Sequence, residues 1–126
     1  MRKLAPARYH GAGCNRIGGA SPVIKVNVLY PNKTGAKFDM DYYCNSHMRL
    51  VQKKLGAALK GLEVDQGLAG GTPGSPPAYV AICHLSFDSV AAFQKAFDPN
   101  AQAIMSDIPN YTDIEPVIQI SEVKME

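Results

Sequence analysis

A histidine and two adjacent tyrosines in the first half of the chain have the residue types that proton transfer needs. Tyr43, His47, Leu50 and Val51 recur at the spacing of one helix face, and Tyr42 lies beside them in sequence. A neutral imidazole can accept or donate a proton near neutral pH, and a phenol one turn away can orient it or hold a substrate oxygen. We therefore predict that His47 is a general acid–base group and that Tyr43 assists it.

A helix from about residue 39 to residue 55 has to position these side chains. Asp39 suits the cap of such a helix, Asp41 suits its first turn, and Gly56 interrupts it. Asp41 is interpreted mainly as a first-turn acid. Its alternative role is as a partner of His47, although their separation along the helix directs the two side chains to different sides.

Other interpretations of these side chains stay open. His47 is also compatible with a core histidine bonded to a backbone carbonyl, or with a haem ligand. Cys44 is expected to be a small buried side chain, and the alternative is a nucleophile. His84 is expected at a subunit interface, paired with Ser86 or Glu63, and the alternative is that it lines a ligand-binding interior. No metal site is predicted, because the two histidines fall on opposite sides of the expected sheet and no carboxylate completes a set.

Four alternating segments predict the strands that must carry this helix, and a second helix lies between the last two of them. The second helix begins at Asp88 or Ser89 and ends at Pro99, and a loop rich in glycine and proline covers 67–77. The predicted strands are 23–30, 62–68, 79–87 and 115–123. The order β-α-β-β-α-β predicts a ferredoxin-like α+β fold, a four-stranded antiparallel sheet with two helices on one face.

The two faces of this sheet differ in character. Alternation places apolar side chains on the helix-covered face, and it places Tyr79 on the same side as Cys83. The residues assigned to the covered face are Val26, Val28, Cys83, Leu85, Ile118 and Ile120. The other face mixes polar and apolar residues, which is too apolar for free solvent and too polar for a core. We therefore predict a homodimer that forms through the open sheet face.

Composition narrows the class of protein. The 126 residues, 46% of them hydrophobic, suit one domain, which we place at 23–126, with a flexible extension at 1–22. A net charge of +2 without basic runs argues against nucleic acid, and no apolar run is long enough to cross a membrane. Three cysteines without C-x-x-C spacing argue against a disulfide framework and favour the cytoplasm.

Three segments together resemble the EthD-like family of the dimeric α+β barrel superfamily. They are Phe38-Asp39 with Tyr42-Tyr43 and His47; Leu85-Ser86-Phe87-Asp88-Ser89 with Ala92-Phe93; and Asp107-Ile108-Pro109-Asn110-Tyr111-Thr112-Asp113. The resemblance covers about residues 23 to 124. Where the family usually has a proline after His-x, this chain has Arg49, so the helix is free to continue.

The resemblance implies a dimeric barrel and a connection with the breakdown of organic compounds. Similar barrels act as cofactor-independent oxygenases, isomerases, dehydratases or haem-handling proteins, so the fold alone does not select a reaction. We expect a small-molecule enzyme or accessory protein of organic-compound metabolism, without a cofactor. If it is an enzyme, the expected classes are a cofactor-independent oxygenase, an isomerase or a lyase.

The expected site is an apolar pocket between the first helix and the sheet. Its ligand would be a small hydrophobic or phenolic molecule. The residues expected to shape it are Tyr42, Leu50, Phe87, Tyr111 and His84. The alternatives are a non-catalytic homodimeric carrier of a hydrophobic intermediate, or a structural dimer in which Tyr43 and His47 are fully packed and no pocket exists.

Overall fold

The computed structural model describes residues 23–126, so the predicted extension at 1–22 lies outside the described residues. The elements are β1 (Ile24–Pro31), α1 (Met40–Tyr42), the π turn η3 (Tyr43–His47), α2 (Met48–Leu55), η4 (Gly56–Ala58), β2 (Gly61–Gln66), β3 (Tyr79–Phe87), α3 (Val90–Phe97), η5 (Asp98–Asn100), α4 (Ala101–Met105), η6 (Ile108–Asn110) and β4 (Val117–Glu122). Within this part of the chain, no helix has the length and apolar character needed to cross a membrane.

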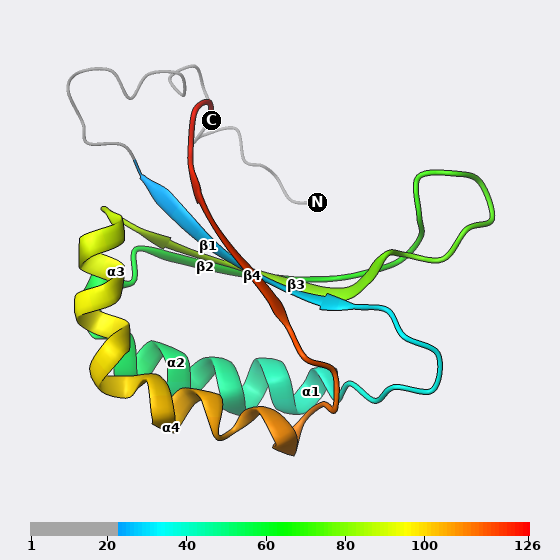
Figure 1. Ribbon diagram of the computed structural model, residues 1–126, viewed down its shortest axis with the longest axis horizontal. Coiled ribbons are helices and arrows are strands. Elements are labelled where there is room, and N and C mark those ends of the chain that lie inside the picture. The colour runs from blue at the N-terminus through cyan, green and yellow to red at the C-terminus, as the bar shows by residue number, and fades with distance from the viewer. Residues whose placement is uncertain (1–22) are drawn as a thin grey trace.

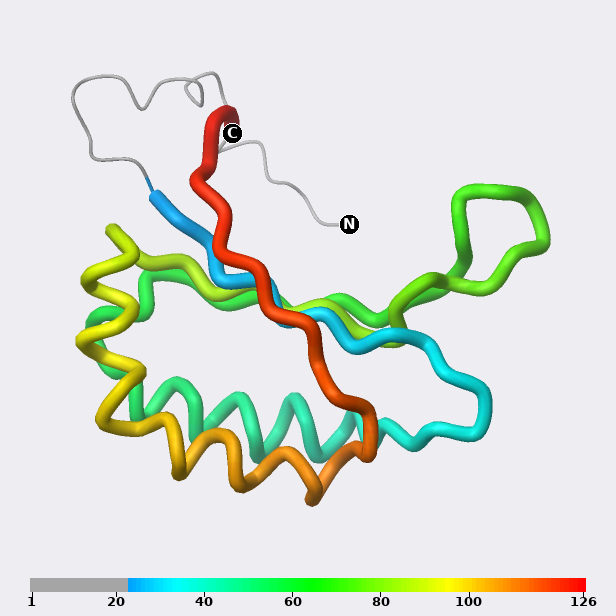
Figure 2. Tube along the Cα trace, viewed as in Figure 1, coloured from blue at the N-terminus to red at the C-terminus, as the bar shows by residue number. Residues whose placement is uncertain are grey.

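The four strands form one antiparallel sheet in the order β2-β3-β1-β4. The helices all lie on one side of it, whereas the β2–β3 loop at 67–78 and the C-terminus lie toward the other side (Figure 1). Figure 2 shows the same path, in which α4 leads back beneath the sheet into β4. The predicted ferredoxin-like α+β fold is therefore confirmed.

The first helical segment runs without a break from Met40 to Leu55, but one of its turns is a π turn. The Asp39 carboxylate caps the helix by accepting the Tyr42 N–H at 3.0 Å, and Gly56 ends it with a φ of 59°. The helix continues past Arg49, as the absence of proline there allows. The π turn spans Tyr43–His47 and was not predicted, because no local sequence pattern specifies one.

This π turn changes which side chains face solvent. Cys44 is exposed, as are Asn45 and Ser46, so the expected burial of Cys44 is wrong. The reason is that the turn holds one more residue than an α-helical turn and rotates this segment outward. Tyr43 and His47, which bracket the turn, are both buried.

The core lies between the helices and the strands β1 and β3. Val26, Leu85 and Phe87 are buried on the helix-facing side, as alternation predicts. Ile118 and Ile120 also belong to that side, since they pair with Val28 and Val26, yet they are 51% and 40% exposed. The helices thus leave the edge strand β4 uncovered.

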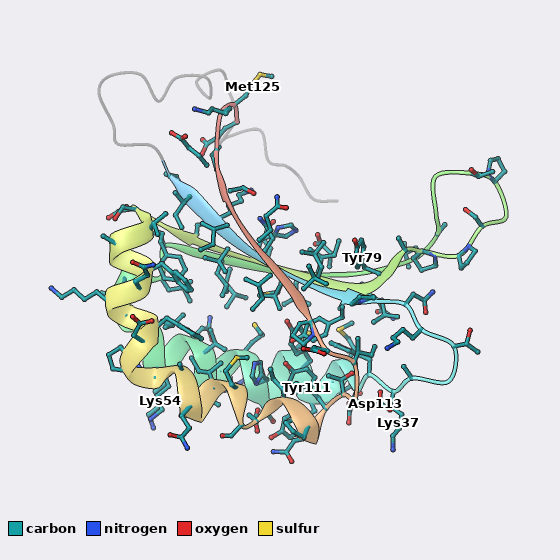
Figure 3. All side chains as sticks on the ribbon, viewed as in Figure 1. Lys37, Lys54, Tyr79, Tyr111, Asp113 and Met125 are labelled. Atoms are coloured by element: carbon teal, nitrogen blue, oxygen red, sulfur yellow. The ribbon has the colours of Figure 1, made fainter. Side chains whose placement is uncertain are left out.

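A β-bulge changes the face on which Tyr79 lies. Tyr30 pairs with Ala81 whereas Pro31 pairs with Tyr79, so one extra residue of β3 is accommodated there. Tyr79 therefore shares the open side with Pro31, away from the helices (Figure 3), and its assignment to the side of Cys83 is wrong. The alternation rule fails here because a bulge shifts the side-chain pattern by one residue.

Candidate functional site

Asp107 completes a hydrogen-bonded constellation around His47. The Nδ1–H of His47 donates to Oδ2 of Asp107 at 2.9 Å. The other carboxylate oxygen, Oδ1, accepts from the Tyr42 hydroxyl and from the Asn110 amide, each at 2.8 Å. The carboxylate is therefore held at both oxygens, and it fixes the orientation of the imidazole.

A short loop after α4 brings Asp107 to the helix that carries His47. The loop is tightened by the Asn110 N–H, which donates to the Asp107 carbonyl at 3.0 Å. It is attached to the start of the helix by the Asp39 N–H, which donates to the Tyr111 carbonyl at 2.8 Å. The acid and the histidine are 60 residues apart in sequence, so only the fold joins them.

Aromatic rings enclose the imidazole. The ring of Tyr43 stacks on His47 with centroids 5.6 Å apart, and Tyr111 contacts it at 4.7 Å. Tyr111 lies in the layer between the helices and the sheet (Figure 3), where its hydroxyl is 2.6 Å from that of Tyr30. The Tyr43 ring also meets the Tyr30 ring edge-on, with centroids 5.6 Å apart. Tyr43 thus orients the imidazole by stacking.

Burial and hydrogen bonding set the charge states of the pair. Burial lowers the pKa of His47 below its ordinary value, and the hydrogen bond and charge of Asp107 oppose this only in part. Burial tends to raise the pKa of Asp107, but the hydrogen bonds from His47, Asn110 and Tyr42 outweigh it, so this pKa lies below its usual value. At neutral pH the carboxylate is ionised and the imidazole is neutral. Because a carboxylate can only accept, the single ring proton of His47 is on Nδ1 and the lone pair is on Nε2.

The stability of the fold is expected to decrease in acid because of His47. Its pKa is lower in the folded than in the unfolded chain, so the folded chain binds fewer protons. The stabilisation is therefore fully present above the unfolded value of about pH 6.5 and is lost as the pH falls below it. Asp107 adds a second loss below about pH 4, because its folded pKa is also lowered. Urea unfolding at a series of pH values measures both.

Two variants separate these contributions. His47→Gln should flatten the loss of unfolding free energy between about pH 7 and pH 5, since glutamine does not titrate. Asp41→Asn, which removes an exposed acid from the same helix, serves as the control and should keep that loss. A wild-type protein and a His47→Gln variant whose stabilities fall in parallel over this range would show that His47 is not its source.

The structure places the other predicted site residues in different surroundings. Tyr42 and Tyr111 join His47, whereas Leu50 is half-buried on α2. Phe87 is fully buried and packs against Phe93 with centroids 5.1 Å apart, so it belongs to the core behind α3. Asp41 is exposed and is not the partner of His47.

His84 lies on the opposite side of the sheet from His47. Its Nδ1 is 2.8 Å from Oδ1 of Asn27, and its Nε2 is 3.1 Å from Oδ2 of Asp65. The predicted pairing with Ser86 or Glu63 is therefore wrong. The cause is geometric, since Glu63 is directly opposite His84 in the register but the imidazole reaches the diagonal neighbour on β2.

Sequence reasoning missed Asp107 and Asn110 as parts of the site. Both belong to the segment Asp107–Asp113, which carried the family resemblance, but nothing local indicates that its first acid faces a helix. The available sequence signal is the spacing of Asp107 and Asn110, which lie three residues apart and are followed directly by Tyr111. No cluster of three or more metal-ligating side chains occurs among residues 23–126.

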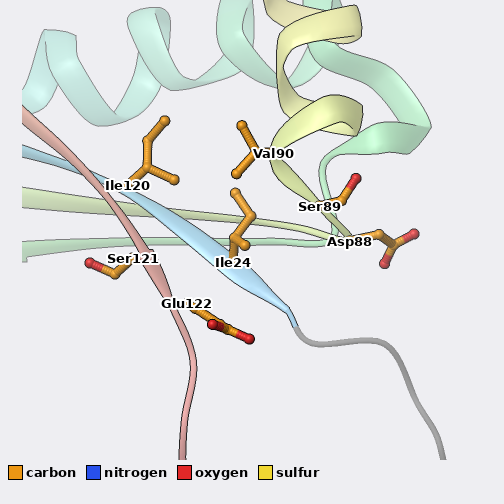
Figure 4. Close-up of a pocket in the computed structure, with 7 residues that line it drawn as sticks. All are labelled: Ile24, Asp88, Ser89, Val90, Ile120, Ser121 and Glu122. Atoms are coloured by element: carbon orange, nitrogen blue, oxygen red, sulfur yellow. The ribbon is translucent and has the colours of Figure 1, made fainter.

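A separate cleft lies where α3 begins beside the sheet (Figure 4). It has a volume of about 630 Å³, an apolar floor and a polar rim. It is lined by Ile24, Asp88, Ser89, Val90, Ile120, Ser121 and Glu122. None of the predicted site residues belongs to this lining, so an apolar binding surface and the His47 constellation are distinct features of the chain.

Comparisons with known proteins place the chain among its relatives. An EthD-like protein from Ralstonia eutropha JMP134 is 50% identical, with a TM-score of 0.78 over 82% of this chain and 93% of that one. A protein of the EthD family from Bacillus halodurans C-125 is 20% identical, with a TM-score of 0.61 over 80% of this chain and 98% of that one. Hydroxynitrile lyase from Passiflora edulis is 13% identical, with a TM-score of 0.56 over 80% of this chain and 93% of that one. A comparison with curated proteins finds no significant match.

The family assignment rests on the chain itself as well as on its relatives. The model of the EthD domain matches residues 32–115, which is more than half of the chain and includes Tyr42, His47 and Asp107. The solved EthD-like relative agrees with it over most of the length. The chain therefore belongs to the EthD family.

Proposed function

We propose that this EthD-family domain is a small-molecule enzyme of organic-compound metabolism in which His47 transfers a proton to or from the substrate. The observation that carries the proposal is the buried His47–Asp107 pair, in which Nδ1 is bonded at 2.9 Å and Nε2 has no hydrogen-bond partner in the described part of the chain. Buried ring nitrogens normally have a hydrogen-bond partner, so the unbonded Nε2 is the atom that we expect a ligand to contact.

The chemistry follows from the tautomer. With its proton held on Nδ1 by Asp107, neutral His47 presents the Nε2 lone pair as a base. When Nε2 takes a proton, the imidazolium is stabilised by the adjacent carboxylate, and the same proton can be returned to the product. Tyr42 and Asn110 keep the carboxylate in place during this cycle. The residues alone thus supply a general base that can become a general acid.

Apolar surroundings suggest the substrate class. Tyr43 and Tyr111 contact the imidazole, and Ile118 and Ile120 expose apolar surface on the helix-facing side of β4. These features favour a small hydrophobic or phenolic molecule whose acidic hydrogen or oxygen meets Nε2. The fold is compatible with an enzyme, since one of the matched structures of this fold is named a hydroxynitrile lyase.

The same proposal includes a homodimer formed through the open sheet face. One end of that face is apolar, with Leu29, Ile82 and exposed Val117 in one row across the strands. Tyr79 and Pro31 extend this apolar area at the bulge. A second copy that covers it would remove it from water, which is the usual role of such a patch.

A non-catalytic carrier is the second candidate, and the burial of the site favours it. The His47 side chain is only 5% exposed, whereas the cleft beside α3 is open and has an apolar floor. A carrier would bind a hydrophobic intermediate in that cleft without using a titrating base. Its binding would be nearly independent of pH around neutrality.

A substrate-depletion screen distinguishes the two functions. Wild type, His47→Gln and His84→Gln are incubated with a panel of phenolic and ketone compounds at several pH values. We expect wild type and His84→Gln to consume a compound at similar rates and His47→Gln to be about 10²- to 10⁴-fold slower. The wild-type rate should decline in acid as His47 becomes protonated. Equal turnover by wild type and His47→Gln would reject the acid–base role, and pH-independent binding without turnover would favour the carrier.

A further inference from the structure

A row of hydrogen-bonded polar side chains crosses all four strands on the open face of the sheet. Asp65 on β2 contacts His84 on β3 at 3.1 Å, and His84 contacts Asn27 on β1 at 2.8 Å. The Asn27 amide continues the row onto β4, where it donates to the Gln119 carbonyl at 3.2 Å and to Ser121 Oγ at 3.4 Å. The row is continuous, and the His47 site does not use it.

The geometry of the row determines how many of its hydrogen bonds each protonation state of His84 can make. The Asn27 amide nitrogen donates toward β4, so its oxygen is the atom that faces Nδ1 of His84. The Asp65 carboxylate faces Nε2. Both partners are acceptors, and only a doubly protonated imidazole can donate to both. The row is fully bonded, therefore, when His84 is an imidazolium.

We propose that this row is the recognition element by which the open face binds a second copy of the chain, with His84 as an imidazolium. The inference rests on the proposed homodimer and adds what selects the partner. Its consequence is that self-association strengthens as the pH falls through the range in which histidines titrate.

The pattern of the face is self-complementary in one orientation. Polar residues occupy the rows at one end of the strands, and apolar residues occupy the rows at the other end. The polar rows hold Lys25, Asn27, Glu63, His84, Ser86, Gln119 and Ser121. The apolar rows hold Leu29, Tyr79, Ile82 and Val117, with Asp65 at the β2 edge of the Ile82 row, where its carboxylate reaches back to His84. When two copies stack face to face about a twofold axis parallel to the strands, polar rows lie on polar rows and apolar rows lie on apolar rows. A twofold axis in the sheet plane but perpendicular to the strands would instead place polar rows on apolar rows.

The same axis brings the central strands of the two copies together. It places β3 of one copy over β1 of the other. His84 therefore lies over the strand that carries Asn27 of the partner subunit. A second copy can therefore continue the polar row across the interface. A partner that covered this row with apolar side chains would remove its charged groups from water without adding a polar contact, which disfavours it.

The charges of the face account for the direction of the pH effect. The groups that face His84 are Glu63 and Asp65 from β2 and Lys25 from β1, while the facing residues of β4 are neutral. With His84 protonated, the two cations balance the two carboxylates. With His84 neutral, each face has an excess negative charge, so two copies repel one another, and the single ring N–H can serve only one of the two acceptors, Asp65 or Asn27.

Sedimentation equilibrium of the full chain tests this proposal between about pH 6 and pH 8.5. We expect the dimer dissociation constant of the wild type to be about tenfold or more lower at the acid end, as one proton-linked ion pair per subunit implies. His84→Gln and Asp65→Asn should remove most of this change. Asp88→Asn is the matched control. Asp88 is an exposed carboxylate that lines the cleft beside α3, away from the open face, so this variant should keep the wild-type pH dependence.

The possible failures are separable. Circular dichroism at each pH confirms that every variant is folded. A monomer at all pH values and micromolar concentrations would reject the dimer of the proposed function. A stable dimer whose dissociation constant does not change with pH, or changes equally in wild type and His84→Gln, would leave the dimer intact and reject the role of His84.

Discussion

Replacement of Asp107 by Asn is expected to lower turnover by about 10²- to 10⁴-fold while the fold is kept. The amide can donate as well as accept, so it no longer requires the proton of His47 to be on Nδ1. It also cannot stabilise an imidazolium. The lone pair on Nε2, which the proposed function needs, is then lost from part of the population. Initial rates of Asp107→Asn and wild type on the first compound consumed in the screen measure the effect.

Asp41→Asn is the matched control for this prediction. Asp41 is the acid that sequence spacing offers as an alternative partner, and it is exposed in the first turn of the helix. Its variant should retain near wild-type turnover. Nitrogen NMR chemical shifts of the His47 ring provide an independent readout, since the Nδ1–H tautomer should dominate in wild type and Asp41→Asn only. A dominant Nδ1–H tautomer in Asp107→Asn would contradict the assigned role of Asp107.

Replacement of Phe87 by Ala is expected to reduce the free energy of unfolding by about 3–5 kcal/mol. Phe87 is fully buried at the end of β3 and packs edge-on against Phe93, so truncation leaves a cavity between the sheet and α3. The loss includes the transfer of the ring to water and the incomplete collapse of the cavity. Urea unfolding near neutral pH measures it through the shift of the midpoint at constant slope.

Phe87→Leu tests whether the loss of stability comes from the cavity that alanine leaves. Leucine fills much of the same volume, so its cost should be clearly smaller than that of alanine. Both variants should leave the pH profile of turnover unchanged, because Phe87 does not contact His47. A cost below about 1 kcal/mol for alanine, together with altered ligand affinity, would instead support the sequence-based assignment of Phe87 to a pocket.

The sequence by itself determines most of the fold. Alternation of apolar residues located four strands, and the caps Asp39 and Ser89 together with the stop at Gly56 bounded the helices. These signals act over a few residues, because strand periodicity and helix capping depend on neighbours along the chain. The π turn at Tyr43–His47 and the bulge at Tyr79 escaped them, since each adds one residue to a regular pattern without a local marker.

The sequence indicated the part of the candidate site on the helix that carries His47, and the loop residue Tyr111, but it did not indicate Asp107. Periodicity placed Tyr43 and His47 on one buried face, but Asp107 comes from a loop 60 residues away. Its position depends on the turn at Ile108–Asn110 and on the hydrogen bond that ties Tyr111 to Asp39. The identity of the residue that faces Nδ1 of His47 was decided by tertiary structure alone, because a contact between distant segments depends on how the whole chain packs.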